Sequence, residues 1–370
     1  MQTIAPVVAD LISSGLAEIV AYATRDSWSV ICESAALVTR LDELAFSTDP
    51  RGYIGSLFDR HQPDLILSGS SPARNRPPET PEQYAIIEAR CRHLPSVGVL
   101  DYWGMYTERF SRDGHNLAED LLPDCLCVLD SRSWDDLKRF GVPAERMTIT
   151  HNPWLDTLAS QSSAAAPAMP TEPRKQSMTV LLASQPLAEM QRVRNLYYNQ
   201  YTIFECLLAA MQKLKGLQPE SVIQVLAHPS EEISRWENRL ASKPYGNVKV
   251  QLLSHHTPSL LREADYLVTS HSTLAYEALY FGTPCISLRP SVKPTTRLWI
   301  DESGLSRVFQ DVDSLAHYFR TNEPTVERQR VLRLKHELTQ SGLFFSDGQA
   351  TRRVAGEVVR MLSAATRMFA

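Results

Sequence analysis

The chain has 370 residues, a length that suits two domains better than one. Apolar residues make up 43% and charged residues 22%, which are ordinary globular values and argue against a disordered or fibrous protein. The formal net charge of -4 offers no basic surface for nucleic acid and no polybasic membrane anchor, so we expect a small-molecule partner.

No targeting or membrane segment is predicted. Residues 1–16 contain apolar side chains, but they lack a basic start and include Asp10, unlike a signal peptide. No run approaches the roughly 18 uninterrupted apolar residues of a membrane-spanning helix. The six cysteines are scattered and mostly lie in apolar runs, which favours reduced core thiols over disulfides or zinc ligands. These features predict a cytoplasmic protein.

Short apolar runs alternate with helical patterns in the first half of the chain, which predicts βα repetition and a parallel sheet. We expect strands at residues 19–24, 65–68, 97–101, 126–130 and 147–150, and helices at 51–60, 82–94 and 133–140. A doubly wound domain usually opens with a strand, whereas residues 3–16 have a helical pattern that ends near Gly15. The first strand is therefore expected to be missing, which puts catalysis in doubt because the loop after it often lines an acceptor site.

Residues 160–177 are rich in Ser, Ala and Pro without an apolar period, which predicts a linker. After it, we expect strands at 180–184, 222–227, 248–253, 266–269 and 285–288, and helices at 198–214, 230–240, 258–263, 273–281 and 349–368. The predicted organisation is an N-terminal domain at 1–159, the linker at 160–177, a second domain at 178–345 and a C-terminal helix at 346–370.

This alternation predicts an α/β fold with two Rossmann-like, doubly wound domains that face a cleft. Ligands of open parallel sheets bind beyond the carboxyl ends of the strands. Two such edges facing one another form a cleft between domains, which is a common place for a small-molecule site. The residues that follow each expected strand are therefore the candidates for a ligand site.

The segment 264–288 carries the strongest chemical signal. Its first strand runs into the turn Ser270-His271-Ser272-Thr273, and a helix follows. Ser272 or Thr273 can cap this helix, and its first amides lack intrahelical partners. Such amides beside small hydroxyl side chains predict a site for a phosphate. The alternative is a capped packing helix that binds no ligand.

Other residues are expected at the same sheet edge. Glu277, about one turn into the helix, is expected to accept hydrogen bonds from ribose hydroxyls, the alternative being a solvated glutamate. His228 ends a strand just before Pro229 and a helix, so it is expected to donate to a phosphate or contact the base. A lone loop histidine is more often structural. Ser184 and Gln185 end another strand and would let a nucleotide lie across the edge.

In the first domain, Asp101 ends a buried strand and is the candidate general base, with a pKa raised by partial dehydration. Trp103 and Tyr106 are expected to stack on a sugar ring, and Arg109 to pair with a phosphate. Ser68, in a small-residue loop, is expected to line the cleft. The alternatives are that Asp101 caps a helix, that the aromatic residues pack the core and that Arg109 forms a structural ion pair.

Several cofactor motifs are absent from the sequence. A Gly-x-Gly-x-x-Gly run after a strand is missing, which argues against a dinucleotide dehydrogenase, and so is a Gly-x-x-x-x-Gly-Lys-Ser/Thr phosphate loop. No paired aspartates form an Asp-x-Asp clamp, so we predict no metal and no cofactor.

Four segments together resemble bacterial surface-polysaccharide proteins with the GT-B fold. Residues 100–110 are similar to their strand-end segment, and 142–153 to the closing first-domain strand with its Asn-Pro hinge. Residues 264–288 are similar to their donor-nucleotide segment, and 347–355 to the start of their last helix. The resemblance spans nearly the whole chain and implies a glycosyltransferase that binds a nucleotide-activated sugar.

Finer resemblances point to two groups of this superfamily. His228-Pro229 and the turn 270–273 are similar to the His-Pro and serine motifs of CMP-sugar transferases, which implies contacts with the nucleotide. The acidic motif that carries the base in those enzymes is reduced here to Asp113-Gly114. UDP-N-acetylglucosamine 2-epimerases share the fold, but their adjacent glycines and paired glutamates are absent.

The leading hypothesis is a metal-independent glycosyltransferase of surface polysaccharide or glycoconjugate synthesis. It would move a sugar from a nucleotide-activated donor, which is a substrate rather than a cofactor, to a hydroxyl of a carbohydrate or other acceptor. The alternatives are an epimerase or hydrolase like the UDP-N-acetylglucosamine 2-epimerases, and a non-catalytic nucleotide-sugar-binding partner. The base, the sugar, the acceptor and the oligomeric state, including a homo-oligomer, stay open.

Overall fold

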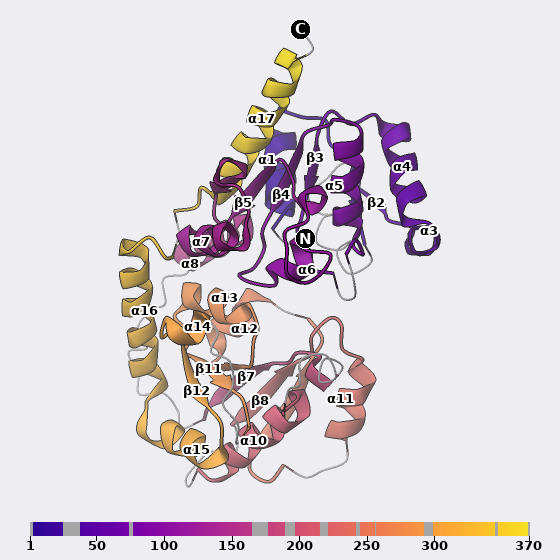
Figure 1. Cartoon of the computed structure of the whole chain (residues 1–370). Coiled ribbons are helices and arrows are strands. Elements are labelled where there is room, and N and C mark those ends of the chain that lie inside the picture. The colour runs from indigo at the N-terminus through magenta and orange to yellow at the C-terminus, as the bar shows by residue number, and fades with distance from the viewer. Residues whose placement is uncertain are drawn as a thin grey trace. The chain divides into compact units, whose positions relative to one another are not determined.

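The computed structural model of the chain describes residues 3–24, 38–73, 77–164, 177–188, 197–214, 221–241, 245–255, 257–291, 299–344 and 347–368 (Figure 1). It contains two compact units, one formed by residues 1–161 and 339–370 and the other by residues 162–338. We call them the first unit and the second unit. Both are built from helices and parallel strands, which confirms the predicted α/β class and the two Rossmann-like domains.

The first unit opens with helix α1 (Ala5–Ser13), as the pattern of residues 3–16 predicts. Its other elements are β1 (Ala21–Ala23), β2 (Val38–Arg40), α3 (Glu43–Thr48), α4 (Pro50–His61), β3 (Ile66–Ser68), α5 (Pro81–Cys91), β4 (Ser96–Val99), α6 (Tyr106–Phe110), β5 (Cys125–Val128), α7 (Ser131–Phe140), β6 (Met147–Ile149), α8 (Pro153–Ala164) and α17 (Ala350–Met368).

Strands β3, β4, β5 and β6 form a parallel sheet in that order. Alternate residues of β5 face opposite sides: Cys125 and Cys127 join a cluster with α1 and α17. Leu126 and Val128 instead pack with Leu137 of α7. Figure 1 shows α1 and α17 side by side along this sheet. The parallel arrangement brings the loops after β3, β4 and β6 to one edge.

Strands β1 and β2 form a separate parallel pair. Tyr22 of β1 and Ile66 of β3 pack against the same hydrophobic cluster of α4 and α5, so the pair lies in the layer of the four-stranded sheet. In the described part of the chain, no strand is hydrogen-bonded between β1 and β3. The pair β1-β2 and the four-stranded sheet are therefore separate in their hydrogen bonding.

The second unit contains a larger parallel sheet. Its elements are β7 (Thr179–Ala183), α10 (Gln200–Gln212), β8 (Val222–Leu226), α11 (Ile233–Leu240), β9 (Lys249–Leu253), α12 (Pro258–Glu263), β10 (Tyr266–Thr269), α13 (Leu274–Phe281), β11 (Cys285–Leu288), α14 (Trp299–Glu302), β12 (Ser306–Phe309), α15 (Val312–Thr321) and α16 (Pro324–Gln340), at whose end the chain returns to the first unit.

The order of the second sheet is β12-β11-β10-β7-β8-β9. Strand β7 comes first in the sequence but lies in the middle: β8 and β9 are added on one side, and β10, β11 and β12 on the other. The chain therefore reverses direction across the sheet between β7 and β10. Figure 1 shows α10 and α15 on one face of this sheet and α12 and α13 on the other. In open α/β sheets such a reversal leaves a crevice at the carboxyl ends of the two strands.

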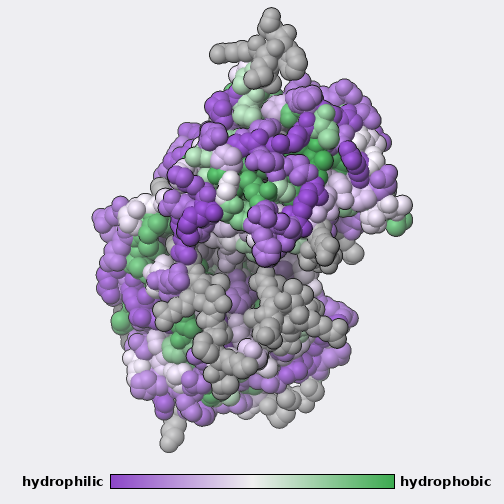
Figure 2. All heavy atoms as spheres, in the orientation of Figure 1, coloured by the Kyte–Doolittle hydropathy of each residue, from purple (hydrophilic) through white to green (hydrophobic). Residues whose placement is uncertain are grey.

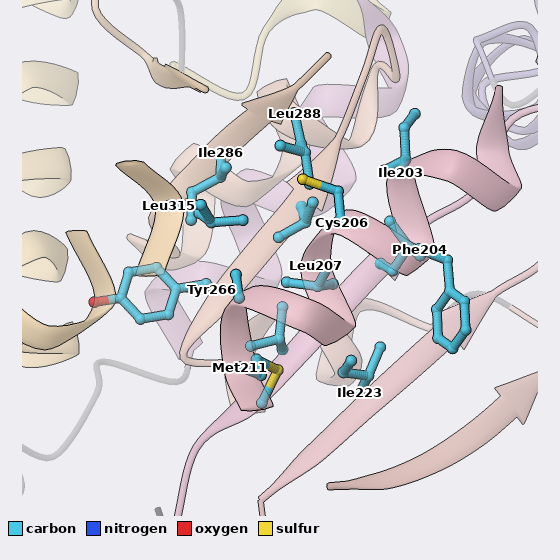
Figure 3. Packing of buried hydrophobic residues seen from close by; sticks show 14 of the residues in the cluster. Ile203, Phe204, Cys206, Leu207, Met211, Ile223, Tyr266, Ile286, Leu288 and Leu315 are labelled. Atoms are coloured by element: carbon cyan, nitrogen blue, oxygen red, sulfur yellow. The ribbon is translucent and has the colours of Figure 1, made fainter. Parts of the chain in front are cut away.

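The core of the second unit lies between α10 and the sheet (Figure 3). Ile203, Leu207 and Met211 recur every four residues and so share one face of α10. They pack with Ile223 of β8 and Tyr266 of β10, and all five side chains are buried. This packing fixes the positions of the strands and therefore of the loops that follow them.

The structure also bears on the predicted linker, on membrane-spanning helices and on the cysteines. Helix α8 extends to Ala164, so the start of the predicted linker is helical, and residues 165–176 lie outside the described residues. Figure 2 shows a face on which hydrophilic side chains predominate and hydrophobic ones form separate patches. In the described part of the chain, no helix has both the length and the apolar character needed to cross a membrane. The described cysteines are free thiols, of which Cys91 is exposed and the others are buried.

Candidate functional site

The carboxyl edge of the second sheet collects most of the residues that the sequence singled out. Ser184 and Gln185 follow β7, His228 lies just after β8, and Ser270 begins the turn after β10. Strands β7 and β10 are hydrogen-bonded neighbours at the reversal of strand order. The structure therefore brings these residues to one edge, at the point where open α/β sheets bind their ligands.

The two residues after β7 connect neighbouring loops. Gln185 Oε1 accepts a hydrogen bond from the backbone amide of His271 at 2.8 Å, across to the turn after β10. Ser184 is buried, and its hydroxyl donates to Glu231 Oε1 at 2.8 Å. Glu231 lies in the loop after β8. The loops after β7, β8 and β10 are thus held together by side chains.

The turn after β10 differs from the sequence expectation, because its amides are largely used within the protein. The amide of Ser272 donates to Thr269 Oγ1 at 3.2 Å, and the amide of Leu274 donates to Ser272 Oγ at 3.3 Å. Thr273 is the N-cap residue of α13, but its side chain makes no cap hydrogen bond, and the residue is exposed. This turn therefore offers a ligand its side-chain hydroxyls and the exposed residue Thr273. It does not offer a row of unpaired backbone amides.

Two other residues of the turn belong to a polar cluster with Tyr198. Nε2 of His271 lies 2.9 Å from the Tyr198 hydroxyl, and the two rings are stacked with their centroids 6.3 Å apart. The hydroxyl of Ser270 donates to the same Tyr198 oxygen at 3.5 Å. Burial raises the pKa of the Tyr198 phenol, so this hydroxyl stays protonated. These contacts orient the turn and connect it to the segment before α10.

A buried ion pair supports the same turn. Arg289 Nη2, just after β11, lies 2.5 Å from Asp301 Oδ2 of α14, and each side chain is only 1% exposed. The same nitrogen donates to the carbonyl of Ser270 at 3.4 Å, and the Ser287 hydroxyl donates to that carbonyl at 3.3 Å. This pair has no signal in the sequence, because its members are twelve positions apart and no local pattern connects them.

Glu277 is placed differently from the expectation of a carboxylate that reaches outward. Residues 275–281 of α13 are all buried, and Glu277 is 5% exposed. The helix is short and apolar, and it contacts both α12 and β10, so it has little free surface. A contact between Glu277 and a ribose stays a prediction.

A small pocket lies at the end of β7. It is lined by Leu182, Ala183, Ser184, Gln185, Leu187, Gln200, Ile203 and Ser270. Side chains of the core and of α10 make one wall apolar, while the strand-end residues supply polar groups. The pocket's empty volume of about 180 Å³ is below the roughly 300–1,000 Å³ of a typical small-molecule pocket, so it would hold only part of a nucleotide.

The first unit holds a second cluster of predicted residues around a buried arginine. The Arg109 side chain is 2% exposed, and its Nη1 lies 2.8 Å from Asp101 Oδ1. The guanidinium also donates to the hydroxyl and the carbonyl of Ser70 and to the carbonyl of Gly104. Arg109 thus connects the loop after β3 to the loop after β4, which is the structural role that the sequence analysis left open. The Asp101 side chain as a whole is 41% exposed, but its Oδ1 atom beside Arg109 is buried, so one of the two carboxylate oxygens is shielded from water. Its role as general base stays a prediction.

The aromatic residues of this region pack inward. Trp103 Nε1 donates to Asp130 Oδ2 at 2.8 Å, and both Trp103 and Tyr106 lie against the hydrophobic cluster around Leu100. Burial raises the pKa of Tyr106 to about 12. These rings therefore stabilise the loop after β4. Ser68, the last residue of β3, is also buried.

The described residues contain no group of three or more His, Cys, Asp or Glu side chains that could hold a metal ion. Three polar residues that support the predicted ones had not been predicted from the sequence: Glu231, Arg289 and Asp301. Only Glu231 had a local signal, because it stands three residues after His228 in the turn that leads to α11.

Comparisons with known proteins agree with this architecture. No protein-family model and no curated protein matches the sequence. In structure, the chain is similar to S. aureus MnaA with UDP, at 14% identity, over 98% of this chain and 94% of that chain, with a TM-score of 0.64. It is also similar to the UDP-GlcNAc 2-epimerase of Neisseria meningitidis bound to UDP-GlcNAc, at 14% identity, over 97% and 96% of the two chains, with a TM-score of 0.59.

MurG from Acinetobacter baumannii matches as well, at 13% identity, over 97% of this chain and 96% of that chain, with a TM-score of 0.50. The chain therefore has the GT-B fold, as the sequence resemblance implied. UDP-N-acetylglucosamine 2-epimerases are among its structural neighbours. At these identities the likeness is one of fold.

Proposed function

We propose that the second unit binds the nucleotide of a nucleotide-activated sugar and that the chain is an enzyme acting on that sugar. The observation that carries this proposal is the convergence of Ser184, His228 and the turn 270–273 at the reversal of strand order between β7 and β10. Structural neighbours bound to UDP and UDP-GlcNAc support uracil as the base.

The phosphates would meet hydrogen-bond donors that the edge already presents. These are the imidazole of His228 and the hydroxyls of Ser272 and Thr273, of which Thr273 is exposed. The N-terminus of α13 adds the positive end of a helix dipole, which favours an anion. The amides that are bound within the turn shape this surface, and the ligand would contact mainly side chains.

Epimerisation or hydrolysis of a UDP-sugar is the first candidate reaction, because it needs no pocket for an acceptor. Trp103 donates a hydrogen bond to Asp130, and both Trp103 and Tyr106 are partly buried against the hydrophobic cluster around Leu100, so their stacking on an acceptor sugar stays a prediction. The structural neighbours described as UDP-GlcNAc 2-epimerases support the same choice. UDP-GlcNAc is therefore the first substrate to test.

Glycosyl transfer to an acceptor hydroxyl is the second candidate reaction. It is favoured by Asp101, which follows β4 at the carboxyl edge of the first sheet with 41% of its side chain exposed. A carboxylate in that position can take a proton from a hydroxyl that attacks the sugar. For this reaction we assign the role of general base to Asp101.

Titration calorimetry with UDP, CMP and GDP tests the binding proposal directly. We expect UDP to bind, and we expect His228→Ala to weaken it at least tenfold, because a hydrogen bond to a charged group contributes about 1.5–3 kcal/mol. His317→Ala is the matched control, since this exposed histidine lies in α15 of the same unit, and it should bind UDP like the parent protein. Equal affinity in the His228 variant would remove that residue from the site, and failure of every nucleotide to bind would end the proposal.

An NMR assay with UDP-GlcNAc separates the two reactions. Formation of the C2 epimer, or release of UDP without any acceptor, identifies the first candidate. Turnover that begins only when a carbohydrate acceptor is added identifies the second. Binding without turnover under both conditions would contradict an enzymatic role and favour a nucleotide-sugar-binding partner.

A further inference from the structure

The loop after β8 is a closed reverse turn. The amide of Glu231 donates to the carbonyl of His228 at 2.8 Å, and the amide of His228 donates back to Glu231 Oε2 at 2.7 Å. One residue thus binds both backbone groups of the other. This reciprocal pair fixes the backbone that carries the imidazole.

The other oxygen of the same carboxylate connects this turn to its surroundings. Glu231 Oε1 accepts a hydrogen bond from the Ser184 hydroxyl at 2.8 Å and another from Trp236 Nε1 at 3.2 Å. Ser184 follows β7, and Trp236 is a fully buried residue of α11. The carboxylate therefore satisfies three donors from three parts of the second unit. A charged acceptor with two oxygens suits this task, whereas an amide side chain has one acceptor oxygen and would place its NH2 group against a donor.

The imidazole of His228 is oriented from inside the turn. The amide of Ser230 donates to His228 Nδ1 at 3.1 Å. A ring nitrogen that accepts a hydrogen bond carries no proton, so the neutral ring must hold its proton on Nε2. The backbone of the turn thereby selects one tautomer of the ring.

We propose that Glu231 is the positioning residue of this site: by closing the turn, it holds His228 as an N–H donor through Nε2. This inference rests on the proposed function only where it concerns the ligand. A ring held in this way pairs with a hydrogen-bond acceptor and opposes a donor. His228 therefore selects an oxygen of the ligand, such as a phosphate oxygen of a nucleoside diphosphate or a carbonyl of its base, and disfavours an amino group at the same place.

The tautomer is measured first, in the protein without ligand. Two-dimensional 15N NMR of the histidine side chains, assigned with His228→Ala, reports which ring nitrogen carries the proton. At a pH above the titration of the ring, we expect the Nε2–H form with little of the other tautomer. A ring that is protonated on Nδ1, or that exchanges evenly between the two forms, would overturn the proposal. This result does not depend on whether UDP binds, so it stands apart from the test of the proposed function.

The second measurement compares Glu231→Gln with Glu232→Gln. Glu232 is the matched control, because it is the next residue, is exposed, and pairs with Arg235 and Ser234 outside this turn. We expect Glu231→Gln to shift the 15N signals of His228 towards a mixture of tautomers and to weaken UDP binding at least fivefold. The Glu232 variant should match the parent protein in both measurements.

A purely structural role for Glu231 would lower the melting temperature of the variant without moving the ring signals of His228. Parent-like ring signals and parent-like UDP affinity in a folded Glu231→Gln protein would likewise refute the positioning role. If that variant fails to fold, the tautomer of the parent protein still decides the question, since the assignment requires the Nε2–H form.

Discussion

Each unit holds a buried arginine at the carboxyl edge of its sheet, but the two arginines have different partners. Arg109 in the first unit is 2% exposed, and Arg289 in the second is 1% exposed. Each guanidinium donates to a backbone carbonyl in a loop that follows a strand. The difference lies in the carboxylates: Asp301 is 1% exposed, whereas Asp101 is 41% exposed.

This difference separates a structural charge pair from one that remains accessible. The pair of Arg289 and Asp301 is buried, and through the Ser270 carbonyl it holds the turn after β10. In the first unit the cation and the Oδ1 atom of Asp101 are buried, while the rest of the Asp101 side chain reaches the surface. The same kind of guanidinium thus supports a turn in one unit and presents a carboxylate in the other.

The largest effect is expected from Arg289→Met. Removing one member of a buried ion pair leaves an unpaired charge inside the protein, which costs about 3–5 kcal/mol. Hydrogen exchange followed by mass spectrometry should therefore show faster exchange in β10, β11 and α13, while β3 to β6 of the first unit keep their protection. Arg307→Met is the control, because Arg307 is 47% exposed and lies 3.9 Å from its partner Glu327. Equal exchange in the two variants would contradict the supporting role of Arg289.

A smaller effect is expected from Arg109→Met. This change removes a buried donor from the loops after β3 and β4, and unsatisfied buried acceptors cost about 1–3 kcal/mol. The Asp101 carboxylate that loses its partner can still be solvated, so the loss should be below that of Arg289→Met. Faster exchange is expected in the first unit alone. Arg112→Met, whose side chain is 41% exposed in its pair with Asp120, should leave exchange unchanged. A loss as large as that of Arg289→Met would abolish the contrast between the two arginines.

The smallest effect on stability is expected from Asp101→Asn. The buried Arg109 loses its carboxylate partner in this variant but keeps its hydrogen bonds to Ser70 and Gly104, so the melting temperature should fall less than in Arg109→Met. If the reaction is glycosyl transfer, the same variant should bind UDP normally and lose most of its turnover of UDP-GlcNAc. Asp301→Asn is the opposite case, with a large loss of stability. Full turnover in the Asp101 variant would exclude that residue as the general base.

Much of the fold could be predicted from the sequence. The expected strands at 180–184, 222–227 and 266–269 correspond to β7, β8 and β10, because buried parallel strands are continuous apolar runs. Strand β12 was missed, since Arg307 and Val308 are exposed and the strand lies at the sheet edge without such a run. A strand with exposed side chains lacks the continuous apolar run by which a buried strand is recognised in a sequence.

The candidate site was predictable where it depends on strand ends. Ser184, His228 and Ser270 were found because each closes an apolar run, and parallel strands bring their carboxyl ends to one edge. The carboxylate of Glu231 was missed because it contacts the ring-bearing turn and a serine 47 residues earlier in the sequence. Long-range polar partners leave no periodic pattern in a sequence.

The sequence by itself determined the α/β class, the alternation of elements and the residues that reach the edges of the sheets. These follow from local rules: side-chain periodicity, helix caps and the direction of parallel strands. Only the tertiary structure decided that the amides of the turn after β10 are used internally, that Glu277 is buried and that Arg109 clamps two loops. These outcomes depend on which groups meet across the fold, because a buried polar group must find a partner wherever packing places one.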